Sequence, residues 1–402
     1  MDPGSFRCRT RGAAVRVLFL SPVVPWPLHS GGRIRTFELL HGLARTDPRP
    51  LVDLHCVEDP APEPALPFEP ESLVHAFQNH PRSSAPFALR LNSPPPVRWF
   101  HSESLRRFLN HDAQWGNWDL VHLDELLLLP YLPPELPLPL VIHHHKLDLD
   151  HAKALGQRGS ICSRWRELEQ KACSRTQHHV VCGREDAQRL AARHKHIRPL
   201  VVPCGADTDK FNTDGRQPVE GRLLFLGSLD YEPNLRALES FVPQLHAARA
   251  RDARLHLQIV GARPDPRVLD LVGDGIALEP NVPDVRPFLQ TAEALVAPLE
   301  IGGGSRVKIC EALAAGCPVL ASPCAMEGLK LVAGEHLVAI SSPSEWPDAL
   351  VELVEDPSKA RAMALEGRER VRAEHHWPDL AALLAAAWGS CLQNPTENAA
   401  PL

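Results

Sequence analysis

The residues of this chain that are best suited to chemistry lie within residues 294–329, where an apolar strand, a glycine turn and a helix follow one another. The turn consists of three consecutive glycines, Gly302, Gly303 and Gly304. We expect the helix to begin near Ser305 and to end at Gly316, because glycine commonly stops helices. A helix start leaves backbone N–H groups unpaired, and together with the helix dipole they favour a bound anion such as a phosphate.

Charged side chains follow this turn at short spacing. Arg306 and Lys308 fall in the first helical turn, where a cation is unfavourable unless an anion is bound beside it. Glu311 follows about one turn later and can accept hydrogen bonds from a pair of sugar hydroxyls. The pattern therefore predicts a site for a diphosphate joined to a ribose. The alternative is a plain strand-to-helix connection in which Glu311 is a solvated helix residue.

Short apolar runs alternate with helical patterns along the whole chain, which predicts parallel sheets with helices on both faces. The expected strands of the first half are Ala14–Pro22, Leu51–Val57, Asp119–Leu123, Pro139–His143, His178–Gly183 and Arg198–Pro203. Those of the second half are Arg222–Leu229, Arg254–Gly261, Ile276–Val282, Glu293–Leu299, Pro318–Ser322 and His336–Ile340. The fold class predicted is α/β, with two doubly wound, Rossmann-like domains and a hinge near residues 204–219.

Ligands of open α/β sheets bind beyond the carboxyl ends of the strands, so residues at those ends could share one cleft. These residues are Gly31 and Gly32, where backbone amides could face an acceptor or a phosphate, His143, His144 and His145, Gly227, and the glycine turn. Consecutive strand residues point to opposite faces, so a single histidine lining the cleft is favoured over a metal-binding triplet. Two D-x-D tripeptides occur, at 148–150 and 207–209; such triplets often arise by chance, and the second belongs to the hinge segment, so neither is taken as a metal site.

Length and composition predict a globular protein of two domains, since the chain has 402 residues with 44% apolar and 23% charged side chains. No apolar run reaches the roughly 18 residues that a membrane span needs. We expect Met1–Arg11 to be a leader outside the fold, and the apolar run after it lacks a signal-peptide cleavage site. Ten scattered cysteines without a C-x-x-C pair indicate a reducing cytoplasm and no metal or disulfide role.

The charge is unevenly distributed. Residues 1–205 carry 25 Lys and Arg against 21 Asp and Glu, which leaves 18 against 28 for the rest of the chain. A basic first half could attract an anionic acceptor or the inner face of a membrane, although a solvated helix face explains it equally well. We expect no nucleic-acid partner.

Six segments in order resemble the glycosyltransferases of the GT-B fold, specifically the large retaining family 4 of the group 1 glycosyl transferases. They are SPVVPWPLHSGGRIRTFELLHGLA, VVPCGADTDKF, LLFLGSLDYEPN, LQIVGARP, VPDVRPFLQTAEALVAPL and GGGSRVKICEALAAGCPVLAS. The resemblance covers nearly the whole chain. It implies an acceptor-binding domain at residues 12–205, a nucleotide-sugar-binding domain at 206–376, and a last helix at about 377–392 that crosses back onto the first domain.

The resemblance also implies roles for single residues. Glu311 matches the second glutamate of the family's E-x7-E motif, which binds the donor ribose, and Gly227 matches the glycine that the diphosphate approaches. The backbone near Val282 matches the segment that reads the base. His145, in preference to His144, matches a position beside the donor sugar.

Three positions depart from the family's pattern. Gly303 replaces the first glutamate of E-x7-E, so the donor sugar must be held by backbone amides or by another residue, and Glu300 is near in sequence. The stretch 228–234 lacks the usual Arg and Lys that hold the diphosphate, and we expect the two cations of the later helix to replace them. Cys204 replaces a hinge asparagine, a change from which we expect little consequence.

These observations predict the transfer of a sugar from a UDP- or GDP-type donor to a hydroxyl acceptor with retention, without a metal or a cofactor. The expected catalytic residues are His145, Arg306 and Glu311, and the expected donor site adds Gly227, Val282, Gly302, Gly303, Gly304, Ser305 and Lys308. The acceptor would be a glycan, a lipid-linked sugar or a small molecule, with cell-surface polysaccharide favoured by the family's habits. The alternatives are a non-catalytic nucleotide-binding partner subunit, which Gly303 motivates, and an inverting GT-B transferase or epimerase.

Overall fold

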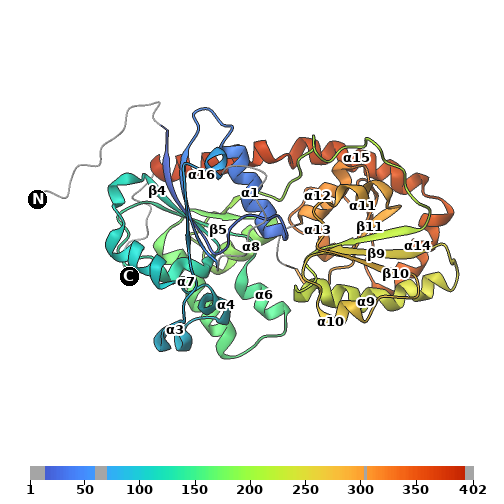
Figure 1. Cartoon of the computed structure of the whole chain (residues 1–402), viewed down its shortest axis with the longest axis horizontal. Coiled ribbons are helices and arrows are strands. Elements are labelled where there is room, and N and C mark those ends of the chain that lie inside the picture. Colours follow the sequence, from blue (N-terminus) through green and yellow to red (C-terminus); the bar gives the residue numbers. More distant parts are fainter. Residues whose placement is uncertain (1–13, 59–69, 303–305, 394–402) are drawn as a thin grey trace, which may run out of the picture.

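The computed structural model describes residues 14–58, 70–302 and 306–393, which form two α/β domains side by side, each built on one parallel sheet (Figure 1). The first sheet runs in the order β3 (Ala76–His80), β2 (Leu51–Val57), β1 (Arg16–Ser21), β4 (Leu120–Asp124), β5 (Leu140–His144), β6 (His179–Val181) and β7 (Leu200–Val201). The second runs β10 (Ile276–Pro280), β9 (His256–Gly261), β8 (Arg222–Leu226), β11 (Ala294–Ala297), β12 (Val319–Ala321) and β13 (Val338–Ala339). The predicted fold class is confirmed.

Helices connect these strands. Those that precede the second sheet are α1 (Gly31–Leu43), α2 (Pro70–Leu73), α3 (Phe87–Asn92), α4 (Pro95–Trp99), α5 (Glu103–Arg107), α6 (Asp148–Ala154), α7 (Ser160–Arg175) and α8 (Arg184–Arg193). The later ones are α9 (Glu232–Arg249), α10 (Pro266–Leu269), α11 (Arg286–Thr291), α12 (Val307–Ala314), α13 (Pro323–Met326), α14 (Trp346–Glu355), α15 (Ser358–Glu374) and α16 (Trp377–Gln393). Single π or 3-10 turns lie at Phe108–Asp112, Trp115–Asn117, Leu126–Tyr131 and Pro343–Glu345.

The central strands β4 and β5 are buried along their whole length because helices cover both faces of the sheet. Every residue of β4 and β5 is buried, which explains why these strands show no alternation of polar and apolar side chains. Among the described residues four clusters of buried apolar side chains result, three of them around the first sheet and one around the second. No helix among the described residues is long and apolar enough to cross a membrane.

The C-terminal helix α16 returns to the first domain and packs against α1. In Figure 1 the red helices α15 and α16 run along one side of both domains. The close approach depends on Gly42, because a Cβ atom there would lie 2.5 Å from the Cβ of Ala381. Deeper in the same contact, Trp388 donates a hydrogen bond from Nε1 to Nδ1 of His122, at 3.1 Å.

Two neighbouring chain segments connect the domains. The first follows β7 and the second joins α15 to α16, and the two are bonded where Ala206 N–H donates to the carbonyl of His375 at 2.9 Å. His375 also donates through Nδ1 to the carbonyl of Cys204 at 2.6 Å. The hinge is therefore a pair of bonded segments rather than a single connection.

Candidate active site

The carboxyl ends of both sheets border one cavity between the domains. Its open volume is about 1070 Å³, with solvent at its mouth included. The first domain contributes the loop before α1 and the start of that helix, through His29, Ser30, Gly31, Ile34 and Glu38. The second domain contributes the ends of β8 and β9, residues 282–285, and one side of α12, including Gly227, Val282, Lys308 and Glu311. The strand ends thus meet at a shared cleft, as the sequence predicts.

Backbone rather than side chains faces the cavity at the end of β8. A Cβ atom on Gly227 would lie 2.6 Å from Nδ2 of Asn234, and one on Gly261 would lie 1.8 Å from the carbonyl oxygen of Gly227. Asn234 is fixed by a hydrogen bond from its Nδ2 to the carbonyl of Ser228, at 2.9 Å. Larger residues at these two glycines would therefore collide with neighbouring protein atoms, so only main-chain atoms of both residues line the cavity.

Glu311 lies on α12 with its carboxyl group directed to this cavity. The side chain is buried and has no hydrogen-bond partner among the described residues. Burial raises the pKa of Glu311 to about 8, although Lys210 lowers it, and the carboxylates of Glu38 and Asp284 raise it further. A buried carboxyl without a partner is well suited to accept hydrogen bonds from ligand hydroxyls, which would favour its ionised form.

Lys308 lies in the first turn of α12, and its ammonium group is held at the end of β8. Nζ donates to the carbonyl of Leu226 at 2.7 Å and to Oδ1 of Asn234 at 3.2 Å, and it lies 4.8 Å from the centre of the Phe225 ring. Burial, followed by the charge of Arg306, lowers the pKa of Lys308 to about 7. The cation thus lies close to the glycine backbone described above.

Arg306 lies elsewhere. Its Nη2 donates to the carbonyl of Cys324 at 2.9 Å, and the residue lines a smaller cavity together with Cys182, Arg189 and Glu327. The expected contact of Arg306 with a diphosphate therefore stays a prediction.

The beginning of the glycine turn contacts the first domain. The Gly302 carbonyl accepts a hydrogen bond from Nδ1 of His151 at 3.2 Å. Gly303, Gly304 and Ser305 lie outside the described residues, so their predicted role in binding the donor is not tested. Glu300 is exposed and accepts a hydrogen bond from Ser240, beside a different cavity that Trp346 also lines, so its carboxylate does not replace the missing glutamate.

His145 follows β5 and is held by the carboxylate at the end of β4. Its Nε2 lies 2.8 Å from Oδ1 of Asp124, whose Oδ2 accepts a hydrogen bond from Thr36 at 2.8 Å. Burial opposes protonation of His145, but Asp124 and then Glu125 outweigh it and raise its pKa. Nδ1 lies 3.3 Å from Oε1 of Glu125 and 3.6 Å from where a Cβ atom of Gly32, the second residue of α1, would lie. His145 is thus the histidine of the triplet that faces the start of α1.

The other two histidines of the triplet are structural. His144 Nε2 lies 2.8 Å from Nδ1 of His179, and burial lowers the pKa of both rings. His143 accepts a hydrogen bond from Nη2 of Arg35 at 2.9 Å, which requires its Nε2 to carry no proton.

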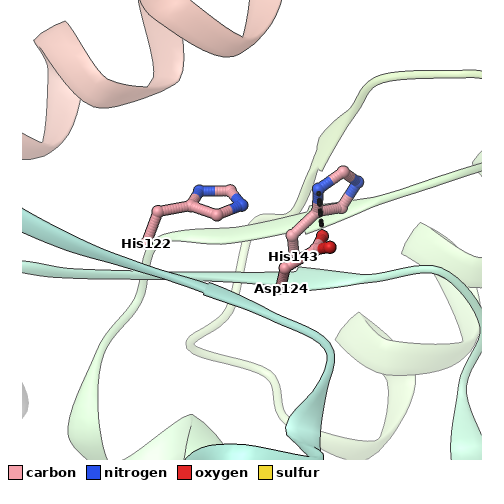
Figure 2. Close-up of side chains that lie close together, drawn as sticks. All are labelled: His122, Asp124 and His143. Atoms are coloured by element: carbon pink, nitrogen blue, oxygen red, sulfur yellow. Dashed lines mark ion pairs between the residues drawn. The ribbon is translucent and has the colours of Figure 1, made fainter. Parts of the chain in front are cut away.

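The side chains of His122, Asp124 and His143 converge in a way that invites a metal interpretation (Figure 2). His143 Nδ1 lies 3.5 Å from Oδ1 of Asp124. A metal bound at that nitrogen would require a proton on Nε2, which instead faces the Arg35 guanidinium. Likewise, a metal at Nε2 of His122 would require a proton on Nδ1, which faces the Trp388 N–H. Because donors would face donors at both rings, the hydrogen bonding of this cluster does not fit a metal.

The sequence pattern missed three residues that hold the site together. Asp124 ends β4 at the same edge as the histidines, and its position after a buried strand could have indicated it. Asn234 holds Lys308, and Tyr231 pairs with His151 across the domains, where its hydroxyl lies 3.3 Å from Nε2. These pairings join residues 74 or more positions apart, so local patterns carry no signal for them.

Comparison with known proteins agrees with this architecture. The family model described as Glycosyltransferase Family 4 matches residues 29–210, and the one described as Glycosyl transferases group 1 matches residues 220–356. No curated protein matches the sequence.

Solved structures share the fold. Sucrose-phosphate synthase from Thermosynechococcus elongatus has 18% identity and a TM-score of 0.72, covering 94% of this chain and 99% of its own. HepE from Anabaena, solved with UDP and glucose, has 12% identity and a TM-score of 0.68, covering 94% and 100%. WaaG, a glycosyltransferase involved in lipopolysaccharide biosynthesis, has 15% identity and a TM-score of 0.65, covering 92% and 98%. The chain belongs to family 4 of the group 1 glycosyltransferases and has their GT-B fold, in which two Rossmann-like domains face a central cleft.

Proposed function

We propose that this glycosyltransferase takes a sugar from a UDP- or GDP-type donor and transfers it to a hydroxyl acceptor with retention at the anomeric carbon. The observation that carries the proposal is the cavity between the domains, in which Glu311 and Lys308 face the start of α1. A nucleoside diphosphate needs an acceptor for its ribose hydroxyls and a cation for its phosphates, and the two side chains supply both on one helix.

The donor would lie along the carboxyl ends of β8 and β9. Glu311 would accept hydrogen bonds from the ribose, the backbone near Val282 would contact the base, and the diphosphate would lie against Gly227 with Lys308 beside it. In favour of this arrangement, the similar protein HepE was solved with UDP and with UDP-glucose. Gly302, Gly303, Gly304, Ser305 and Arg306 are proposed to complete the donor site.

The sugar would extend toward the first domain. Nδ1 of His145, which lies 3.3 Å from Oε1 of Glu125, would contact a donor-sugar hydroxyl in place of that carboxylate, while Nε2 stays bonded to Asp124. The leaving diphosphate would be stabilised by Lys308 and by the backbone at the start of α12, without a metal. The acceptor hydroxyl would enter from the side of Gly31 and Gly32.

Calorimetry with UDP, GDP, ADP and TDP, each with EDTA present, tests the donor class. We expect one diphosphate to bind without metal and Glu311→Ala to weaken it strongly, whereas Glu300→Ala, in the cavity beside Ser240, should leave binding unchanged. Release of that diphosphate from its sugar conjugate, with analysis of the product anomer, tests turnover and retention. Binding without turnover would support the non-catalytic alternative, an inverted product would refute retention, and no binding would refute the donor site.

Contact with the cytoplasmic face of a membrane is a second proposal, supported by a surface formed by α3 and α4. Phe87, Leu91 and Trp99 are 76%, 50% and 68% exposed there, next to Arg90. Apolar and basic side chains on one surface suit anionic lipid headgroups. Co-sedimentation with anionic vesicles, lost in Phe87→Ser with Trp99→Ser, would support this, and equal binding to neutral vesicles would contradict the electrostatic part.

A further inference from the structure

We propose that Cys204 and Cys182 form a peroxide-reactive thiol pair at the hinge, with Cys204 as the attacking thiolate and Cys182 as the thiol that resolves it to a disulfide. The expectation that Cys204 has little consequence is thereby revised. The inference does not depend on the identity of the donor.

The two cysteines meet because adjacent strands deliver them to one place. Cys182 directly follows β6, and Cys204 lies three residues after β7. The strands pair in parallel with Val181 opposite Val201, and Val202 N–H continues the pairing by donating to the Val181 carbonyl at 2.9 Å. The Cys182 thiol donates to the carbonyl of His144 at 3.5 Å, and the two cysteines lie near enough for each to shift the pKa of the other.

The sulfur of Cys204 is surrounded by donors. Arg306 N–H donates to Sγ at 3.3 Å, and Nη1 of Arg35 donates to it at 3.7 Å. The neighbouring Cys182 side chain lowers the pKa of Cys204 to about 5 against the opposing effect of burial, with further contributions from Arg35 and the Arg306 N–H. A sulfur atom that accepts from two N–H donors is stabilised as the thiolate, which is the nucleophilic form.

Arg35 gives an independent reason to place a negative charge here. Its side chain is completely buried on α1, and it donates to the carbonyls of Val202 and Pro203 and to His143, all of them uncharged. Within the described ranges no carboxylate pairs with this guanidinium. The Asp124 carboxylate stabilises the Arg35 charge only from beyond contact distance, and Cys182 and Cys204 contribute more, so a thiolate here would be the nearer counter-charge.

Both cysteines line one small cavity. Its open volume is about 330 Å³ with solvent included. Arg189, Glu185 and Glu327 also line it, so a small polar oxidant can enter. Cys310 is the contrasting neighbour, because its thiol only donates to the Cys204 carbonyl, at 3.7 Å, and burial raises its pKa well above the usual value.

The chemistry balances with hydrogen peroxide as the oxidant. The Cys204 thiolate attacks one peroxide oxygen, so an S–O bond forms, the O–O bond breaks and hydroxide leaves. The Cys182 sulfur then attacks the Cys204 sulfur, the S–S bond replaces the S–O bond, and the departing hydroxide takes the thiol proton as water. Two thiols are oxidised by two electrons and one peroxide is reduced to two waters. The product would remove the charge between Arg35 and α12 and would join the end of β6 to the hinge.

Peptide mapping by mass spectrometry after a short peroxide treatment of the full-length protein at pH 6 tests the proposal. With a pKa of about 5, Cys204 is almost entirely thiolate at pH 6, whereas an ordinary thiol is almost entirely protonated. A thiolate of low pKa is also a weaker nucleophile, so the net expectation is that Cys204 reacts about tenfold faster than an ordinary thiol. We expect a Cys182–Cys204 disulfide that a dithiol reverses. The wild-type protein is enough to overturn the proposal. Disulfides that join other cysteines would do so, and so would oxidation of Cys310 as fast as that of Cys204.

Two variants separate the roles. Cys182→Ser should leave Cys204 reactive but unresolved, so that it gains two oxygen atoms as sulfinic acid. Cys204→Ser should leave Cys182, in the same cavity, at most one tenth as reactive. Equal reactivity of Cys182 with and without Cys204 would show that access rather than the thiolate controls oxidation.

Discussion

Proton exchange on nucleotide binding would report directly on the two ionisable groups of the cavity between the domains. With a pKa of about 8, Glu311 is roughly 90% protonated in the empty site at pH 7, and with a pKa of about 7 roughly half of Lys308 is uncharged. Ribose hydroxyls that donate to Glu311 favour the carboxylate, so a proton leaves. A diphosphate near Lys308 favours the ammonium form, so a proton is taken up.

The two effects oppose each other and change with pH. At pH 7 full ionisation of Glu311 releases about 0.9 proton and full charging of Lys308 takes up about 0.5, a net release of about 0.4. At pH 8 the same groups release about 0.5 and take up about 0.9, a net uptake of about 0.4. The exchange should therefore change sign near pH 7.5. Uridine, which lacks phosphate, should release protons at both pH values.

Calorimetry in pairs of buffers with different ionisation enthalpies measures these numbers. In Glu311→Gln, UDP binding should no longer release protons and should take them up at both pH values. In Lys308→Met, UDP binding should no longer take up protons. The phosphate's own ionisation, with a pKa of about 6, contributes only about 0.1 proton at pH 7. A UDP exchange that keeps its sign between pH 7 and 8 would refute the opposing titrations. Unchanged release of protons by uridine in Glu311→Gln would refute the ribose contact.

Three further predictions concern stability and turnover. Glu311→Gln should raise the free energy of unfolding of the empty protein by up to about 4 kcal/mol at pH 8 and change it little near pH 4.5, as measured by denaturant unfolding. The reason is that folding raises the pKa of Glu311 from 4.5 to about 8, so the wild-type protein loses stability as the pH rises through that window. Gly42→Ala should cost about 1–3 kcal/mol, since its Cβ would lie 2.5 Å from Ala381, whereas Gly389→Ala, also helical but with open space around it, should be neutral or stabilise by up to about 1 kcal/mol. His145→Asn should lower kcat/KM about a hundredfold and leave the affinity for the free diphosphate unchanged.

Each of these has a result that would contradict it. An equal effect of Glu311→Gln on stability at both pH values would mean that folding does not raise the pKa of Glu311. Equal losses of stability in Gly42→Ala and Gly389→Ala would mean that Gly42 is not needed for the close approach of α1 to α16. His178→Asn, at a cavity beside α16, is the control for His145, and equal losses of activity would indicate a general effect on folding.

The sequence predicted most of the fold because buried parallel strands are long apolar runs. The strand that it missed, β3, is mostly exposed, and its sequence AFQNH has no apolar run to detect. The helical pattern across residues 151–175 predicts one helix, whereas the structure has α6 and α7 there, since Gly156 and Gly159 have φ of 82° and 58°, outside the helical region. Local composition identifies what is buried, but the backbone of a connecting loop depends on what packs against it.

The two cations at the start of α12 do not by themselves indicate a bound anion. In the sequence, Arg306 and Lys308 at a helix start indicated a bound anion, because the helix dipole opposes them. In the structure both already have oxygen acceptors, from Cys324 for the first and from Leu226 and Asn234 for the second. Their position alone is therefore no evidence for a phosphate. The stronger reason is the pKa of Lys308, lowered to about 7, because two neutral oxygen acceptors do not compensate the burial of its charge and an anion in the adjacent cavity would.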